Sequence, residues 1–195
     1  MNKNDKPEGE KVGWHLLDTT YPFVTKWIKL RQDRVHLDRA GREIDFTYYD
    51  GSGAVCVVPV TADGQLVLIK QYRYTVDEWC LEVPAGGLHD AGEASIEDVV
   101  RKELCEEIGA SCARLTYVNN IYEALGQSSQ RFHIYLAEGV AFTEQPEHED
   151  TENIELCPVP ASEAVRLART GQIKDGVSAL AILLCEDLLR ELGCI

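Results

Sequence analysis

The sequence lacks the marks of a disulfide-bonded or zinc-binding protein. Its seven cysteines are odd in number and scattered along 195 residues, and no two of them form a C-x-x-C pair. The five histidines show no metal-ligand spacing either. This usage excludes a disulfide framework and a zinc site of ordinary spacing, and it is typical of free thiols in a reducing compartment.

Basic residues are scarce relative to acidic ones. The chain holds 19 Lys and Arg against 33 Asp and Glu, which gives a formal net charge of −14. Binding to nucleic acid or to an anionic membrane depends on clustered Lys and Arg, so we expect neither partner. An anionic substrate would gain nothing from the overall charge and would need a local cation to recruit it.

Long apolar runs and repeats are also missing. No segment approaches the length of a membrane span, and the polar start MNKNDKPEGEKVG has no apolar signal core. Residues 1–12 therefore predict a disordered lead. Together with the free thiols, these absences lead us to expect a cytoplasmic protein.

The length suits one buried domain with an appendage. The appendage is an N-terminal β region at residues 13–50, where alternating patterns at 35–37 and 44–48 flank a turn at 38–41. This region has too few apolar residues to stand alone. It must pack on the main domain or on a second copy of itself.

Residues 51–195 predict a mixed α/β domain. An apolar run at 53–60 is typical of a strand buried on both faces. The remaining patterns predict strands at 66–72, 79–83, 115–122, 131–137 and 154–159, and helices at 95–108, 162–170 and 177–192. The order predicts a mixed sheet with helices packed outside it.

One of these helices is strongly acidic on one face. Ser95 is a plausible N-cap, and Gly109 is placed to end the helix with a left-handed residue. Glu103, Glu106 and Glu107 project together from the face opposite the apolar one. Like charges so spaced repel one another, and a clustered all-oxygen ligand set suits Mg²⁺. The alternative is a solvated acidic helix face.

A longer pattern surrounds these carboxylates. The run Gly87, five residues, Glu93, then Lys102-Glu103-Leu104-x-Glu106-Glu107-x-Gly109-Ala110 resembles the Nudix box, G-x5-E-x7-R-E-U-x-E-E-x-G-U with U aliphatic. Two departures stand out. Lys102 replaces the arginine, and eight residues rather than seven separate it from Glu93, in a loop that absorbs length changes. Lysine keeps the charge but loses the planar fork, so we expect weaker orientation of the carboxylates and an intact site.

The similarity extends beyond the box. The segments QYRYTVDEWCLEVPAGG, GQSSQRFHIYLAEGV and EDTENIELCPV resemble the ADP-ribose and nucleotide-sugar pyrophosphatase branch of the Nudix family. The resemblance implies a Nudix-type α/β/α sandwich with a mixed sheet over residues 51–195. It also implies that the N-terminal β region mediates dimerisation, so we expect a homodimer.

The resemblance further implies a metal site that takes Mg²⁺, with Mn²⁺ as a substitute. Glu103 and Glu107 would be the principal ligands, with Glu106 close behind as a ligand and a candidate catalytic group. The carbonyl of Ala85 would add a ligand. Glu93, one loop away, would either bind metal or hydrogen-bond the helix.

The general base of this branch resembles an acidic residue in a loop before a late strand. That description matches residues 148–152. Glu152 is the first choice because it lies two residues before Ile154, where the strand pattern anchors the loop, and Asp150 is the second. The alternative is that residues 143–152 form only a solvated acidic loop.

Three residues are candidates for substrate binding. Arg73 would clasp the diphosphate or a ribose edge, against the alternative of an ordinary surface pair. Trp79 would stack on a base, against the alternative of core packing. The resemblance adds Gly126, at the start of the GQSSQ segment. Gln130 stands where several relatives have Glu, so we do not expect an acid–base role there.

Three functions follow. The leading one is Mg²⁺-dependent hydrolysis of ADP-ribose or a related nucleoside diphosphate sugar to a nucleoside monophosphate and a sugar phosphate. A nucleoside triphosphate or dinucleoside polyphosphate hydrolase shares the box. A catalytically silent module that binds a nucleotide sugar and regulates a partner remains a third.

Overall fold

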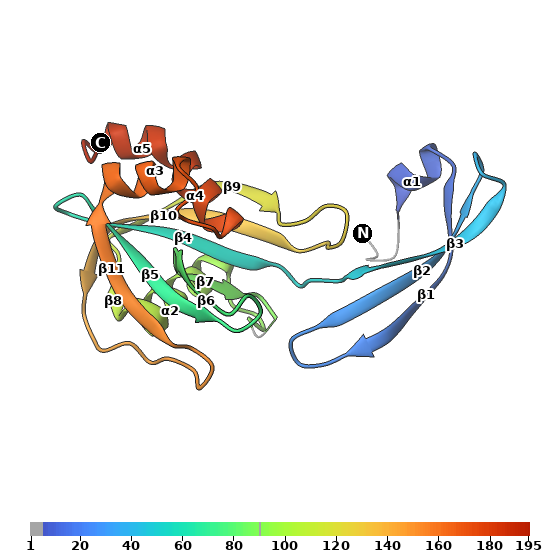
Figure 1. Cartoon of the computed structure of the whole chain (residues 1–195), viewed down its shortest axis with the longest axis horizontal. Coiled ribbons are helices and arrows are strands. Elements are labelled where there is room, and N and C mark those ends of the chain that lie inside the picture. Colours follow the sequence, from blue (N-terminus) through green and yellow to red (C-terminus); the bar gives the residue numbers. More distant parts are fainter. Residues whose placement is uncertain (1–5, 90) are drawn as a thin grey trace. The chain divides into compact units, whose positions relative to one another are not determined.

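The chain forms two compact units, which we describe separately (Figure 1). The computed structural model describes residues 6–89 and 91–195. The first unit contains the described residues up to Gly51 together with Ala124–Gln130, and the second contains Ser52–Glu123 and Arg131–Ile195. No helix in the described part of the chain is both long enough and apolar enough to cross a membrane.

The first unit is a three-stranded antiparallel sheet with a short helix. Strands β1 (Trp14–Val24), β2 (Lys29–Leu37) and β3 (Arg42–Tyr49) pair in the order β1-β2-β3. Strands β2 and β3 are the pair predicted around the turn at 38–41. Of the expected disordered lead, residues 1–5 lie outside the described residues. Helix α1 (Pro7–Lys11) lies within the rest, and it begins at a proline, whose missing N–H costs nothing at that position.

The second unit is built on a mixed sheet. Its elements are β4 (Ala54–Thr61), β5 (Gln65–Arg73), β6 (Glu78–Glu82), β7 (Ala85–Gly87), α2 (Ile96–Ile108), β8 (Ala110–Ser111), β9 (Arg114–Tyr122), β10 (Arg131–Phe142), β11 (Ile154–Pro160), α3 (Ala161–Arg169), α4 (Gly176–Leu184) and α5 (Glu186–Glu191). The main path runs β11-β5-β4-β10-β8, with β6 on β5, β7 on β4 and β9 on β10. Strands β4 and β10 are parallel, and the other pairs are antiparallel.

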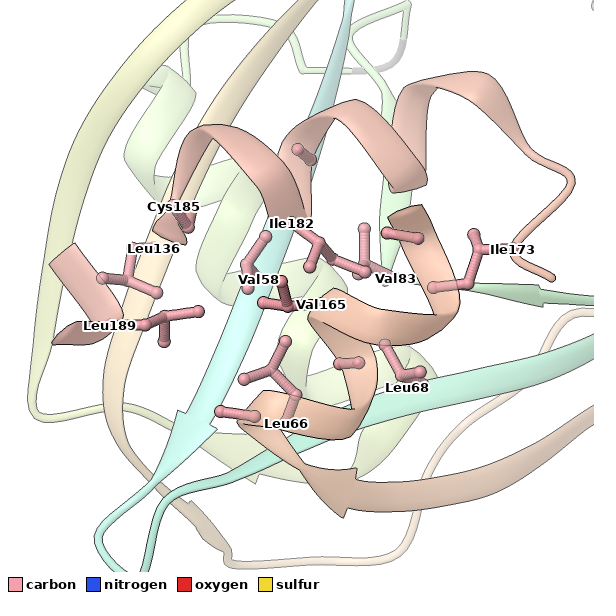
Figure 2. Packing of buried hydrophobic residues seen from close by; sticks show 14 of the residues in the cluster. Val58, Leu66, Leu68, Val83, Leu136, Val165, Ile173, Ile182, Cys185 and Leu189 are labelled. Atoms are coloured by element: carbon pink, nitrogen blue, oxygen red, sulfur yellow. The ribbon is translucent and has the colours of Figure 1, made fainter. Parts of the chain in front are cut away.

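Helices cover both faces of this sheet. Along β4 the side chains alternate, so Val55 and Val57 join one core with α2 while Cys56 and Val58 join another with α3, α4 and α5. Figure 2 shows the second core, in which Val58 and other strand residues face the helices. Full burial of both faces explains why β4 reads as a continuous apolar run. The predicted α/β/α sandwich with a mixed sheet is confirmed.

Two predicted elements differ in detail. The single helix expected at 177–192 is divided into α4 and α5 at Cys185. There the N–H of Cys185 donates to the carbonyls of both Ala181 and Ile182, which tightens the last turn of α4. The Gly-rich segment at residues 84–87, for which no strand was predicted, contains the short strand β7, because its backbone pairs with β4.

Candidate functional site

Helix α2 begins and ends where the sequence predicts. The hydroxyl of Ser95 accepts a hydrogen bond from the N–H of Asp98 at 3.2 Å, and the Asp98 carboxylate accepts one from the N–H of Ser95 at 3.0 Å. This capping box fixes the first turn. At the other end Gly109 has a φ of 64°, the left-handed conformation that favours glycine. The carboxylate-bearing part of α2 therefore has two fixed ends.

Two of its carboxylates are turned inward against β7. Glu107 is only 3% exposed, and its Oε2 accepts a hydrogen bond from the N–H of Ala85 at 3.0 Å. Glu103 is half-buried against Gly86, where an added Cβ would lie 2.0 Å from the Glu103 carboxyl carbon. A side chain at residue 86 would therefore displace the Glu103 carboxylate from its present position.

Burial raises the pKa of both Glu103 and Glu107. Burial raises the pKa of Glu103 to about 7; the charge of Lys102 opposes this shift, and neighbouring carboxylates add to it. Burial also raises the pKa of Glu107 well above its usual value, with the charge of Glu103 as a further cause. A buried and a half-buried carboxylate on one turn of a helix need protons or a cation for compensation. Their oxygen donors fit Mg²⁺ or Mn²⁺.

The third carboxylate of the helix has another partner. Glu106 forms an ion pair with Lys102, with 2.7 Å between Oε2 and Nζ, and both side chains reach solvent. Lys102 stands at the arginine position of the box. Glu93 is exposed in the loop before α2. Within residues 6–89 and 91–195, no three His, Cys, Asp or Glu side chains are already gathered as a metal cage.

A cavity of about 570 Å³ opens beside Ala85. Arg73 lines it and holds Glu82 through two contacts, one of them 2.8 Å between Nε and Oε1. Lys174 and Glu78 form a second ion pair at its wall. Arg73 therefore forms an ion pair with Glu82 and lines the same cavity as Ala85.

Glu82 is a site residue that the sequence analysis missed. In β6 Cys80 and Glu82 are buried, whereas Trp79, for which core packing was the alternative to base stacking, is 48% exposed. Trp79 lies under the ammonium of Lys70, at 5.3 Å from ring centre to Nζ, and does not line this cavity. The sequence signal that could have identified Glu82 is its position two residues after Cys80, which places both side chains on the same face of the strand.

Gly126 and Gln130 belong to the first unit, unlike the carboxylates of α2. Gly126 lines a cavity of about 490 Å³ together with residues of α1, β1 and β3. Gln130 is buried beside Gly51, where an added Cβ would meet its side-chain oxygen at 1.8 Å. The structure therefore does not bring Gly126 together with Arg73 and Trp79 in one unit.

The acidic loop at residues 143–153 joins β10 to β11. Glu152 is half-buried, and its carboxylate accepts a hydrogen bond from the N–H of Glu149 at 2.8 Å. The negative charge of Glu152 contributes to the raised pKa of both Glu103 and Glu107. Asp150 is exposed at the turn of the loop.

The chain is similar to known proteins in sequence and in fold. The family model of the NUDIX domain matches residues 52–180. An ADP-ribose pyrophosphatase of Bacillus subtilis (strain 168) is 31% identical over 67% of this chain and 70% of its own length. A GDP-mannose pyrophosphatase of Pectobacterium atrosepticum is 28% identical over 72% of this chain and 76% of its own. A crystal structure of an ADP compounds hydrolase shares the fold, with a TM-score of 0.80 and 20% identity, over 93% of this chain and 97% of that one.

The chain therefore belongs to the Nudix family, a family defined by the box that α2 and its preceding loop carry. The resemblance to the ADP-ribose and nucleotide-sugar pyrophosphatase branch is confirmed by these relatives. Of the two departures from the box, Lys102 forms an ion pair with Glu106, and the longer spacing falls between Glu93 and the first turn of α2.

Proposed function

We propose that this protein hydrolyses the diphosphate of ADP-ribose or of a related nucleoside diphosphate sugar, using Mg²⁺ or Mn²⁺. The class, a Nudix hydrolase acting on phosphoric anhydrides, follows from the family and its relatives. The observation that carries the proposal is the packing of buried Glu107 and half-buried Glu103 against Ala85 and Gly86, of which Ala85 also lines a cavity. Free rather than disulfide-bonded cysteines support the proposed cytoplasmic location.

We assign Glu103 and Glu107 as the principal metal ligands. Glu106 would join them by exchanging its Lys102 partner, and Ala85 would add its carbonyl. Glu93 would act as a ligand or as a hydrogen-bond partner of the helix. When bound, the cation supplies neutralisation of the diphosphate oxygens, whose charge otherwise repels a nucleophile.

The other roles fall to side chains of this chain. Arg73 binds a diphosphate oxygen through its guanidinium while Glu82 holds the guanidinium in orientation. Glu152 accepts the proton of the attacking water, since it is half-buried two residues before β11 and its negative charge acts on Glu103 and Glu107. Asp150 is the alternative acceptor. Trp79 and Gly126 stay candidates for base or sugar contacts.

A hydrolysis screen tests the proposal. ADP-ribose, UDP- and GDP-sugars, NADH, dinucleoside polyphosphates and nucleoside triphosphates would each be incubated with the protein and Mg²⁺. We expect release of a nucleoside monophosphate and a sugar phosphate from a nucleoside diphosphate sugar. Preferred cleavage of triphosphates would replace this proposal with the triphosphate hydrolase, and ligand binding without turnover would replace it with the silent regulatory module.

A further inference from the structure

The last carbonyls of α2 require partners outside the helix. The last four backbone carbonyls of an α-helix accept no hydrogen bond from within the helix. In α2 the N–H of Gly109 donates to the carbonyls of Cys105 and Leu104. The carbonyls of Glu106 and Glu107, which belong to the carboxylate-bearing turn, are left to be satisfied from elsewhere.

The acidic loop supplies those partners. The N–H of Glu147 donates to the carbonyl of Glu106 at 2.9 Å. Nε2 of His148 lies 2.9 Å from the carbonyl oxygen of Glu107. Because a carbonyl only accepts hydrogen bonds, that nitrogen must carry the proton and donate. Two consecutive loop residues thus cap two consecutive residues of the metal-site helix.

The loop also contacts the end of α2 through its backbone. The N–H groups of Thr143 and Glu144 donate to the carbonyl of Gly109 at 2.9 and 3.1 Å. An added Cβ on Gly109 would lie 2.3 Å from the carbonyl oxygen of Glu144. The backbone of the loop therefore rests directly on the glycine that ends α2.

Glu107 is consequently held at two points. Its carboxylate is fixed by the N–H of Ala85, and its carbonyl by the imidazole of His148. The loop continues past His148 to Glu152, which is half-buried. Two loop side chains bind this turn of α2: Glu144 accepts a hydrogen bond from the thiol of Cys105, and His148 alone of the two binds its backbone, at the carbonyl of Glu107.

We propose that His148 is a positioning residue, whose imidazole ties the acidic loop to the metal-site end of α2 and so places Glu152 for proton transfer. The placement of Glu152 rests on the proposed hydrolase function, whereas the docking of the loop does not. A loop residue must be ordered before it can act, and one donated hydrogen bond biases the loop toward the docked conformation.

Three variants of the full chain test this inference. His148→Phe keeps an aromatic ring and removes the donor. His148→Gln keeps an N–H donor on a side chain of similar reach. Glu147→Gln is the matched control, because it changes a neighbouring charge and leaves the backbone N–H of that residue in place.

The first readout is amide hydrogen exchange of residues 143–152, measured without substrate or metal. We expect His148→Phe to speed exchange at Glu147 about 3- to 10-fold, the effect of losing one hydrogen bond. His148→Gln should restore most of the protection, and Glu147→Gln should match the wild type. Equal exchange in the wild type and His148→Phe would refute the docking role.

The second readout is steady-state kinetics on the substrate found by the screen. We expect His148→Phe to lower kcat about 10-fold with KM within about twofold, because the transition state is affected more than substrate binding. Equal losses in His148→Phe and His148→Gln would overturn the positioning role, since a donor would then be irrelevant. If the wild type hydrolyses nothing while the exchange difference persists, the proposed function fails and the docking of the loop stands.

Discussion

The two units of the chain bury their sheets in different ways. In the second unit both faces of the sheet are covered, and β4 is buried from Ala54 to Val60. In the first unit the described residues 6–51 bury a single apolar side chain, Val35, beside the charged pair Arg31 and Asp33. Large apolar side chains are exposed there instead: Trp14, Leu17, Tyr21, Phe23, Val24, Trp27, Ile28 and Phe46.

The two units are therefore stabilised by different kinds of interaction. The second unit holds its site on helices and strands fixed by two apolar cores, as a precise constellation of carboxylates requires. The first unit is organised around a polar network and leaves apolar surface that suits a partner. We propose that a second copy of the chain covers it, which is the predicted homodimer.

The largest effect should come from the buried carboxylate of the second unit. We expect Glu107→Gln to lower kcat about 10³-fold, because a metal-binding charge is lost while the side-chain shape remains. The glutamine oxygen can still accept the hydrogen bond from Ala85, so the melting temperature should change little. Turnover near the wild-type value at saturating Mg²⁺ would contradict the assigned site.

The next effect concerns the loop. We expect Glu152→Gln to lower kcat about 10²-fold with little change in KM, within the range for a placed general base. Glu149→Gln and Asp150→Asn should be milder, since both side chains are exposed. Kinetics of the three single variants give the ranking, and a large loss at Asp150 beside a small one at Glu152 would move the role to Asp150.

The first unit should respond in stability rather than in chemistry. Asp33 accepts from Arg31 at 2.7 Å, from Thr19 at 2.7 Å and from Tyr48 at 3.2 Å. Removing one member of a buried pair typically costs about 3–5 kcal/mol, so Asp33→Ala should destabilise this unit by about 3 kcal/mol.

Hydrogen exchange of residues 29–49 measured against residues 54–73 would locate that loss. The matched control is Asp45→Ala, because Asp45 is an exposed carboxylate on the same sheet. Equal effects of the two changes would show that the buried network does not organise the unit.

The smallest expected effect is a change in the oligomeric state. Replacing exposed Phe23 and Trp27 together by Lys should halve the mass in solution, because charge would be forced into the apolar contact. Phe142→Lys is the control, since Phe142 is similarly exposed in the second unit. Light scattering reports the mass, and a wild type that already has the mass of one chain would remove the dimer from the comparison.

Local signals were sufficient for the helix and its carboxylates. Ser95 and Gly109 fix the ends of α2 through contacts within a few residues, and the spacing of Glu103 and Glu107 then decides which way they point. The division at Cys185 was not predictable in this way, because apolar spacing continues across it.

Contacts between segments that are distant in the sequence could not be predicted from the sequence. Glu82 is buried because Arg73 on the neighbouring strand compensates its charge, and a single strand pattern contains no such partner. The capping of Glu107 by His148 joins segments 41 residues apart, so no local pattern predicts it. A histidine without ligand spacing gave no reason to single it out.

The parallel pairing of β4 with β10 has a kinetic consequence. It joins Ala54 to Phe132, so the chain must close a loop containing β5 to β9 and α2 before these strands meet. In the first unit each strand pairs with its neighbour in sequence. Pairings of high sequence separation form slowly, so we expect the second unit to set the refolding rate. Until β10 arrives, the apolar strand AVCVVPV has an open edge, and aggregation during refolding should be fastest in that interval.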